Sequence, residues 1–334
     1  MIKFENTQVM GWEAAIRGMR NPMNSWEKSD SGQGCSVDFV DRRCVDCDRY
    51  DNEYEYGLCR HDKYVIGPND LDLMRRLAAG GPVHAKYRRM ITVYVDITAP
   101  LYWWKEFDTY KVGTVANSCS TMHKIADKEF TLEDFSTEHL LDEKDYYEVL
   151  NAENEYPQME ETDGNDVYYT PKDFIEQTIY VLNFYRKKYH EISDELKKTQ
   201  ESYIVVALDA NEKALKIREL QKKKKIYWWQ MIQLLPSSYN QKRTVMLNYE
   251  VLAHIYKDRK YHKLDEWREH ETVDIISGEK IIRTIPNQHQ GFCDWIKTLP
   301  YSELIIPQTK SKASNDCDCF QPILENVGKG DSKG

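Results

Sequence analysis

The segment that most constrains the fold is residues 90–123, where a strand pattern is followed by a helix pattern and then by a polar turn. Met90–Ile97 alternates between aliphatic and more polar residues, which predicts a strand with one buried face. Pro100 then suits the first turn of a helix that carries two tryptophans and a phenylalanine. The residues that follow are mostly small and polar. A strand, a helix and a hydroxyl-rich turn in this order can place hydrogen-bond donors around an anion.

Other segments give helix and strand signals along the rest of the chain. Helical patterns or helix end signals occur at residues 12–19, 68–79, 171–185 and 193–225. We also expect a helix over Val245–Arg259 and a hairpin over Val273–Ile282, where two short strands flank a Ser-Gly turn. With 334 residues the chain is long enough to bury a sizeable core. These elements predict an α+β protein.

The charge balance and hydropathy exclude several classes of partner. The chain has 46 Lys and Arg against 55 Asp and Glu, whereas polyanion binding needs clustered cations, so we expect no nucleic acid partner. No apolar run is long enough to span a bilayer, and the first residues lack the apolar core of a signal peptide. We therefore expect a soluble cytoplasmic protein with no membrane partner. A small phosphorylated ligand held by a few local cations is compatible with this composition.

A separate cluster of soft metal ligands lies between residues 35 and 61. Its members are Cys35, Cys44, Cys47, Cys59 and His61. They include one Cys-x-x-Cys pair, and four such ligands can form a closed tetrahedral zinc site. A structural zinc would hold together a segment that lacks a core of its own. Free thiols in a solvated loop are the alternative, because the outer spacings match no standard zinc finger.

Residues 81–123 and 228–267 together resemble the flavin-dependent thymidylate synthases (the ThyX family), of the divergent type found in phages and prophages. In that family a His precedes a strand that ends in Ala-Pro, and the signature Arg-His-Arg-x-x-Ser-x-Asn-Glu-x-Ser-x-Arg-Tyr follows. His84 and Ala99-Pro100 fall at matching intervals. Thr109-Tyr110-Lys111 stands where the family has Arg-His-Arg, and so keeps one cation.

The rest of the signature aligns in two ways. Thr114 matches the first Ser in both of them. Without a gap, Cys119 stands at the second Ser, whereas one inserted residue matches Asn117 and Ser120 instead. We prefer the second alignment because it keeps two residue types. Neither alignment supplies the last Arg of the signature.

The downstream segment resembles the turn and helix with which the family binds its nucleotide. Leu235-Pro236 matches the turn, and Arg259 matches the Arg that contacts the pyrimidine. His262 lies one residue before the position of the family's His, and Glu266 follows it. If the helix continues past Arg259, these three side chains share one face, because residues three and four apart are neighbours on a helix.

The resemblance implies a fold, a reaction and a set of partners. The fold would be an α+β core, an antiparallel sheet packed with helices, forming one domain over residues 1–304. Insertions would interrupt it at about 29–63 (Cys-rich), 143–170, 193–225 and 268–291, and residues 305–334 would be a flexible tail. The family binds FAD and dUMP and transfers a one-carbon unit from methylene-tetrahydrofolate to C5 of uracil, with NADPH as reductant. It works as a homotetramer whose active site is shared between subunits. A phage-encoded member would act in the cytoplasm of its bacterial host.

The resemblance also implies roles for individual residues. Arg259 and His262 would be catalytic, because a guanidinium stays charged and can stabilise negative charge on the pyrimidine. The nucleotide would be bound by Lys111, Ser118, Ser120 and Arg259, which supply a cation and hydroxyl donors for phosphate. The flavin would be bound by His84, Lys105, Tyr110, Lys111 and Asn117.

Several alternatives remain open. The loss of Arg-His-Arg favours a phage enzyme on the same scaffold that hydroxymethylates dUMP or dCMP. A protein that kept the fold but only binds nucleotides or partners is the alternative from another class. At the level of residues, the segment from Thr109 to Thr121 is also compatible with an ordinary capped turn. Arg259 and His262 are compatible with a surface pair near a helix C-terminus, where cations are favoured anyway.

Overall fold

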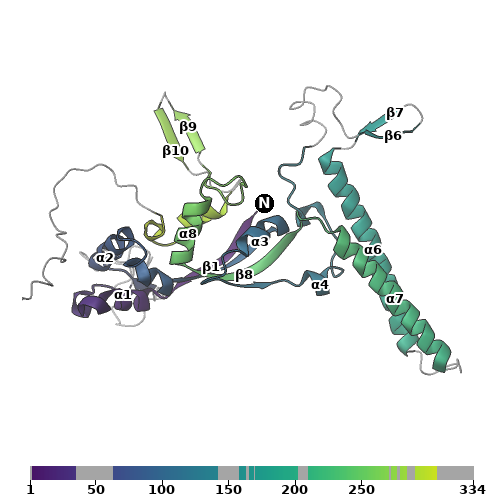
Figure 1. The fold of residues 1–334 in the computed structure, drawn as a ribbon, viewed down its shortest axis with the longest axis horizontal. Coiled ribbons are helices and arrows are strands. Elements are labelled where there is room, and N and C mark those ends of the chain that lie inside the picture. The colour runs from purple at the N-terminus through teal and green to yellow at the C-terminus, as the bar shows by residue number, and fades with distance from the viewer. Residues whose placement is uncertain are drawn as a thin grey trace, which may run out of the picture.

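A four-stranded antiparallel sheet forms the centre of the chain in a computed structural model, and its strand order is β1-β4-β8-β5 (Figure 1). These strands are β1 (Lys3–Met10), β4 (Thr92–Pro100), β5 (Val115–Ser118) and β8 (Asn240–Asn248). The structure describes residues 2–34, 63–141, 158–162, 165–168, 170–201, 210–270, 272–276, 279–283 and 290–306. The expected strand over Met90–Ile97 is confirmed as β4, and the α+β class is confirmed with it.

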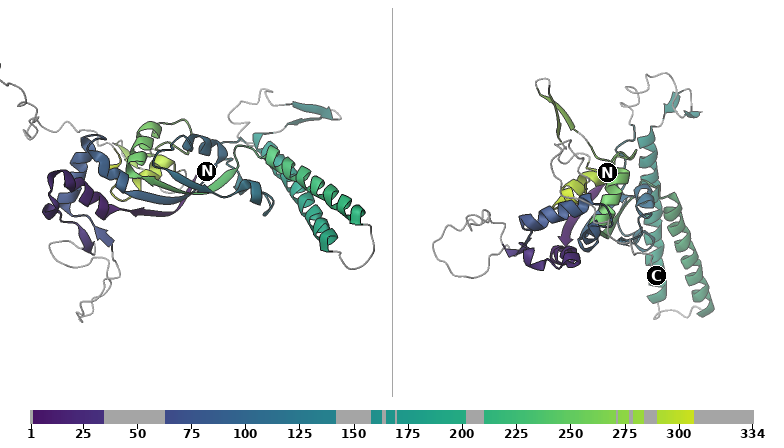
Figure 2. Two further views of the ribbon diagram at one scale, coloured as in Figure 1. Left: turned by 60° about the horizontal axis from the view of Figure 1, so that its bottom comes forward. Right: turned by 60° about the vertical axis from the view of Figure 1, so that its left-hand side comes forward.

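One face of this sheet is buried under helices. Val93, Val95 and Ile97 of β4 are at most 1% exposed, whereas Tyr94 between them is 39% exposed. The buried residues pack against α3 (Leu101–Phe107), α8 (Tyr249–Arg259) and α9 (Phe292–Lys297). Figures 1 and 2 show these helices on the same side of the sheet. Alternation along the strand therefore separates a core face from a polar face, as the sequence predicts.

The helix predicted over Val245–Arg259 is wrong in its first part. Residues up to Asn248 belong to β8, because Val245 and Leu247 enter the core on one face while Thr244 lies exposed on the other. Asn248 then caps α8 by accepting hydrogen bonds from the amides of Glu250 and Val251, at 3.1 and 3.0 Å.

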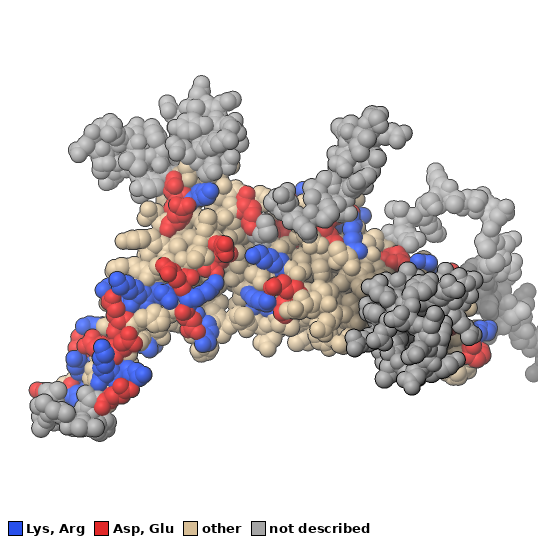
Figure 3. Space-filling model, turned by 180° about the vertical axis from the view of Figure 1, so that it is seen from behind, with Lys and Arg blue, Asp and Glu red and all other residues tan. Residues whose placement is uncertain are grey.

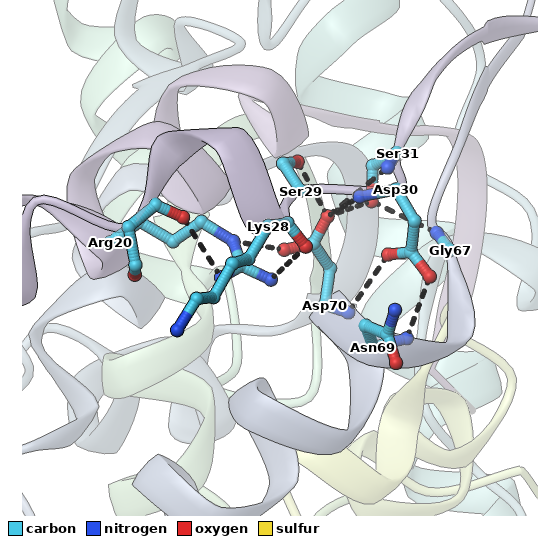
Figure 4. Close-up of polar contacts among 9 residues, drawn as sticks. Arg20, Lys28, Ser29, Asp30, Ser31, Gly67, Asn69 and Asp70 are labelled. Atoms are coloured by element: carbon cyan, nitrogen blue, oxygen red, sulfur yellow. Dashed lines mark hydrogen bonds and ion pairs between the residues drawn. The ribbon is translucent and has the colours of Figure 1, made fainter.

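The first helices are joined by a buried polar network (Figure 4). α1 (Trp12–Arg20) ends at Arg20, whose Nε donates to Asp70 of α2 (Pro68–Ala79) at 2.6 Å. The same Asp70 carboxylate accepts from the hydroxyls of Ser29 and Ser31, at 2.7 and 2.6 Å. This network fixes the chain next to β2 (Gly32–Gly34) and β3 (Lys63–Val65), which flank the Cys-rich segment.

A pair of long helices extends away from the sheet. They are α6 (Pro171–Glu201) and α7 (Ala210–Leu234), and they pack along each other in Figures 1 and 2. The predicted insertion over residues 193–225 covers the ends of these helices that lie away from the sheet. Figure 3 shows charges of both signs over this pair and mostly uncharged side chains across the central body. A second core, with Ile175, Leu182 and Met231, anchors the pair to Phe130 and Phe135.

The remaining elements are short. They are α4 (Thr121–Lys124), β6 (Gln158–Thr162), β7 (Asn165–Tyr168), β9 (Thr272–Ile276), β10 (Glu279–Arg283) and 3-10 turns at Asn21–Met23, Trp26–Lys28, Ala85–Met90, Leu132–Asp134 and Ser302–Leu304. The predicted hairpin over Val273–Ile282 is confirmed as the pair β9 and β10. Among the described helices, none combines the length and apolarity that crossing a bilayer requires.

Candidate functional site

The Arg259 cluster, defined as Glu106, Tyr110, Arg259, His262 and Trp267, forms where the end of α8 meets the end of α3. The Arg259 guanidinium donates from Nη1 to Oε2 of Glu106 at 2.6 Å and from Nε to the Tyr110 hydroxyl at 2.8 Å. It also lies 5.1 Å from the centre of the Trp267 ring, within range of a cation–π interaction. The Arg259 side chain is 18% exposed, so it is not fully closed off from solvent.

His262 completes the cluster although α8 does not continue to it. The helix ends at Arg259, so the condition for one helical face shared by Arg259, His262 and Glu266 is not met. A turn still brings His262 Nε2 to 2.7 Å from Arg259 Nη1 and 3.3 Å from Glu106 Oε2. Glu266 instead accepts a hydrogen bond from the Tyr102 hydroxyl.

The protonation state of His262 follows from its surroundings. Its Nδ1 lies 3.1 Å from the amide nitrogen of Leu264 and its Nε2 lies 2.7 Å from Arg259 Nη1, so both ring nitrogens face hydrogen-bond donors. Burial lowers the pKa of His262 and the Arg259 charge adds to this, while the Glu106 carboxylate opposes it. The net effect is a pKa below the ordinary value of 6.5, which favours a neutral imidazole at pH 7.

The second group of candidate site residues lines an open cavity of 450 Å³, called the Ser120 cavity below. It lies between the end of β5, the start of β8 and α4. Its wall includes Cys119, Ser120, Thr121, Lys124, Lys128 and Lys242. The Ser120 hydroxyl caps α4 by accepting from the amide of His123 at 3.3 Å. Carboxylates pair with the lysines: Lys124 lies 2.8 Å from Asp127, and Lys128 pairs with Asp134. The cavity thus offers hydroxyl donors and cations that can exchange partners.

Arg243 is a further cation, on β8, that lies beside the Ser120 cavity, since its Nε donates to Gln241 of the cavity wall at 3.0 Å. It pairs with Ser118 across β5 and β8, so both side chains lie on the same face of the sheet. Its guanidinium stacks 4.2 Å from the centre of the Trp104 ring and donates to Asp108 at 2.7 Å. Ser118 therefore has a fixed cation beside it that the sequence did not identify.

The structure brings some predicted residues together and separates others. Tyr110 and Arg259 are in contact, and Lys111 is adjacent to them in the chain. Ser118 and Asn117 lie on β5, and Ser120 lines its own cavity. His84 is exposed next to Gly80 at the end of α2, and Lys105 is exposed on α3. Figure 1 shows α8 and α4 on either side of α3, and α2 beyond α8.

The predicted metal ligands lie outside the described residues. Cys35, Cys44, Cys47, Cys59 and His61 all fall in the gap between residues 34 and 63. Across the described ranges, no group of three or more His, Cys, Asp or Glu side chains is arranged to hold a metal ion. The zinc site therefore stays a prediction.

Sequence reasoning missed Glu106 and Trp267 of the Arg259 cluster, Arg243, and the lysines of the Ser120 cavity, which are Lys124, Lys128 and Lys242. Arg243 was missed because the start of β8 was not recognised as a strand. The alternation of Lys242, Thr244 and Met246 with Arg243, Val245 and Leu247 carries that signal. For Glu106 and Trp267 no signal in the sequence indicates a contact with Arg259, which depends on how α3 and α8 cross.

Comparison with known proteins gives structural neighbours only. No protein-family model and no curated protein matches the sequence. Thymidylate synthase X from Helicobacter pylori, solved with FAD and dUMP, matches with a TM-score of 0.38 and 12% identity over 79% of this chain and 86% of that chain. The UMP/dUMP methylase PolB from Streptomyces cacaoi, bound with 5-Br dUMP, matches with a TM-score of 0.36 and 12% identity over 79% and 80% of the two chains. TM-scores of this size do not establish a common fold.

Proposed function

We propose that this chain is an enzyme of the flavin-dependent thymidylate synthase type, which binds a pyrimidine deoxynucleotide and transfers a one-carbon unit from methylene-tetrahydrofolate to C5 of its base. The sequence resemblance makes dUMP the expected substrate and dTMP the expected product, with FAD as cofactor and NADPH as reductant. The proposal rests on the Arg259 cluster, in which hydrogen bonds to Glu106 and Tyr110 hold the guanidinium in one orientation. The side chain of Arg259 is still 18% exposed.

The Arg259 cluster has the properties that a pyrimidine ring requires during C5 chemistry. Negative charge develops on the base when C5 becomes nucleophilic, and a fixed cation stabilises it without reorganisation. Arg259 donates from Nη1 to Glu106 and from Nε to Tyr110. Its third nitrogen, Nη2, has no hydrogen-bond partner among the described residues. This nitrogen can donate to a carbonyl oxygen of the base. His262 lies next to the guanidinium, and its lowered pKa favours a neutral ring at pH 7.

The Ser120 cavity suits the phosphate of the same nucleotide. Its lysines are 40% to 71% exposed, so their ion pairs contribute little and can be exchanged for a phosphate at small cost. Figure 1 shows α4, which borders the cavity, and α8, which carries Arg259, on either side of α3. We therefore propose that one copy supplies the cavity and another copy supplies Arg259, within the homotetramer that the resemblance implies.

The residues of one chain do not fit FAD. Among the proposed flavin ligands, the Tyr110 hydroxyl is used by Arg259, while His84 and Asn117 lie on separate elements. They do not converge on one cavity in the described parts of the chain. A flavin would need residues from further copies. Hydroxymethylation of dUMP or dCMP is the second candidate, because that reaction transfers the same one-carbon unit without a reductant.

Nucleotide binding tests the proposal. We expect calorimetry to show that Arg259→Gln and Ser120→Asp each weaken dUMP binding by about tenfold or more, since each loses or repels a charge-assisted contact. Ser120→Asp keeps an acceptor for the cap of α4 and opposes only the phosphate. Arg268→Gln is the matched control, because this arginine is 47% exposed and pairs only loosely with Asp265, at 3.7 Å. Equal affinity in the Arg259 and Arg268 variants would contradict the proposal.

Flavin content is measured on the same preparations. Flavin that is released on denaturation and detected by its absorbance would support FAD as the cofactor. Protein that binds dUMP but takes up no added FAD would favour the second candidate. Analysis of the products from dUMP and dCMP then separates methylation from hydroxymethylation.

A further inference from the structure

We propose that Gln241 is a positioning residue of the phosphate site, because its side-chain amide makes the Thr121 hydroxyl a hydrogen-bond donor in the wall of the Ser120 cavity. This role rests on the proposed function, since the phosphate is that of the bound pyrimidine nucleotide. It also names what the cavity recognises, which is a group whose oxygens only accept hydrogen bonds.

Two partners fix the orientation of the Gln241 amide. Arg243 can only donate, and its Nε lies 3.0 Å from Oε1 of Gln241. The backbone carbonyl of Cys119 can only accept, and it lies 3.0 Å from Nε2 of Gln241. A flipped amide would place two donors together on one side and two acceptors together on the other. The amide nitrogen of Gln241 therefore lies on the side of Cys119.

Arg243, which orients this amide, is itself held in place. Its guanidinium stacks 4.2 Å from the centre of the Trp104 ring and donates to Asp108 at 2.7 Å. Trp104 is buried, and its indole Nε1 donates to the backbone carbonyl of Gln241 at 2.9 Å. The backbone of Gln241 and the cation that orients its side chain are thus both fixed by one tryptophan. Rotation of the amide would break a charge-assisted hydrogen bond.

The fixed amide sets the direction of the Thr121 hydroxyl. Nε2 of Gln241 donates to Oγ1 of Thr121 at 3.1 Å, so this oxygen already accepts a hydrogen bond. The hydroxyl proton has no acceptor among the described residues. Because Thr121 lines the Ser120 cavity, a ligand in the cavity can supply that acceptor.

The neighbouring Ser120 hydroxyl has the same arrangement. Its oxygen accepts from the backbone amide of His123 at 3.3 Å, and within the described ranges its proton has no acceptor either. Ser120 and Thr121 therefore present two hydroxyl protons side by side in the wall of one cavity. Adjacent donors of this kind match the terminal oxygens of a phosphate, which accept several hydrogen bonds.

The lysines of the cavity attract an anion but do not give it an orientation. Lys124 lies 2.8 Å from Asp127, and Lys242 lies 2.8 Å from Glu5, in ion pairs that are largely exposed. An ammonium group is a point charge with rotatable donors, so it binds a phosphate from any side. The two hydroxyls add donors with a set direction. A free nucleoside offers only a 5′-hydroxyl there, so the cavity favours the nucleotide.

A double-mutant cycle between Gln241 and Thr121 tests this role. Gln241→Glu still accepts from Arg243 but has no donor, so the Thr121 hydroxyl must donate to the new carboxylate and is lost to the phosphate. We expect the dUMP affinity, measured by calorimetry, to fall by about tenfold or more in Gln241→Glu and in Thr121→Val. When Gln241→Glu is added to Thr121→Val, the further loss should be less than about threefold, because the hydroxyl is already gone. Gln233→Glu makes the same change at an exposed position of α7 and should bind dUMP as the wild type does.

Two further variants separate hydrogen-bond direction from charge and from folding. Gln241→Met removes the amide without adding a charge, and it replaces Gln241→Glu in the cycle if that variant does not fold. Its loss should be about threefold to tenfold, and it should again be absent in the Thr121→Val background. Thr121→Ser keeps the hydroxyl and should stay within about threefold of the wild-type affinity. Deoxyuridine lacks the phosphate, so NMR titration should give it the same affinity for every variant.

The outcomes distinguish this role from the proposed function. Equal losses from Gln241→Glu with and without the Thr121 hydroxyl would mean charge repulsion alone and would overturn the role of Gln241. Unchanged dUMP affinity in Thr121→Val would overturn it as well, and in both cases the proposed function stands because the wild type binds dUMP. A wild-type chain that binds no dUMP would overturn both.

Discussion

Two arginine–carboxylate pairs in this chain use the same chemistry in opposite ways. Arg20 and Asp70 are 5% and 0% exposed, whereas Arg259 and Glu106 are 18% and 35% exposed. The Asp70 carboxylate is saturated by Arg20, two serine hydroxyls and two backbone amides. Arg259 keeps one nitrogen without a partner among the described residues. Arg20 and Asp70 therefore form a closed pair, which stabilises the fold. Arg259 and Glu106 form an open pair, which can bind a ligand.

The pKa values of the two sites reflect this difference. Burial alone would raise the pKa of Asp70, but hydrogen bonds from Ser31, Ser29 and Arg20 and the charge of Arg20 outweigh it, so the net shift is downward. The carboxylate is therefore charged throughout the physiological range. In the Arg259 cluster, burial of His262 lowers its pKa below the ordinary value of 6.5.

The largest expected effect is loss of the closed pair. Asp70→Asn should lower the free energy of unfolding by about 3–5 kcal/mol, because it leaves the buried Arg20 charge without a counterion. Urea denaturation measures this. Asp72→Asn is the control, since Asp72 is 64% exposed in a surface pair with Arg76 and should change stability by less than about 0.5 kcal/mol. Equal effects in the two variants would show that the buried network does not anchor α2.

A smaller effect is expected when the open pair is loosened. Tyr110→Phe removes the hydroxyl that accepts from Arg259 Nε at 2.8 Å. The guanidinium keeps its contact to Glu106 and is only loosened, so dUMP affinity should fall by about twofold to tenfold. Tyr94→Phe, on the polar face of the sheet, is the matched control. Unchanged affinity in Tyr110→Phe would show that this hydroxyl does not orient the guanidinium for binding.

The smallest expected effect is on the pH dependence of stability. The folded pKa of His262 lies below 6.5, so the unfolded chain binds the proton more readily as pH falls. The contribution of neutral His262 is fully present above pH 6.5 and is lost as pH drops through its folded pKa. The free energy of unfolding should therefore decline more steeply below pH 6.5 in the wild type than in His262→Gln. Parallel curves from urea denaturation would contradict this assignment.

The sequence predicts local elements better than it predicts contacts between them. The alternation in β4, the helix signals around α2 and the two strand patterns of the β9–β10 pair are local patterns, and the structure contains each of these elements. β8 was partly misassigned because Val245, Leu247 and Leu252 are compatible with a helix until the capping role of Asn248 is known. The partners of Arg259 could not be predicted, because Glu106 and Trp267 reach it through tertiary packing alone.

The central claim is that Arg259 of one copy and Ser120 of another hold the same nucleotide. Arg259→Gln and Ser120→Asp chains are refolded together, and the number of dUMP sites is measured by calorimetry against each variant alone. Random mixing in a symmetric oligomer gives about a quarter of the sites an intact Arg259 and an intact Ser120 from different copies. We predict recovery of about that fraction, at wild-type affinity. No recovery, with each variant still folded and oligomeric, would place both residues in one chain or outside the site and contradict the account.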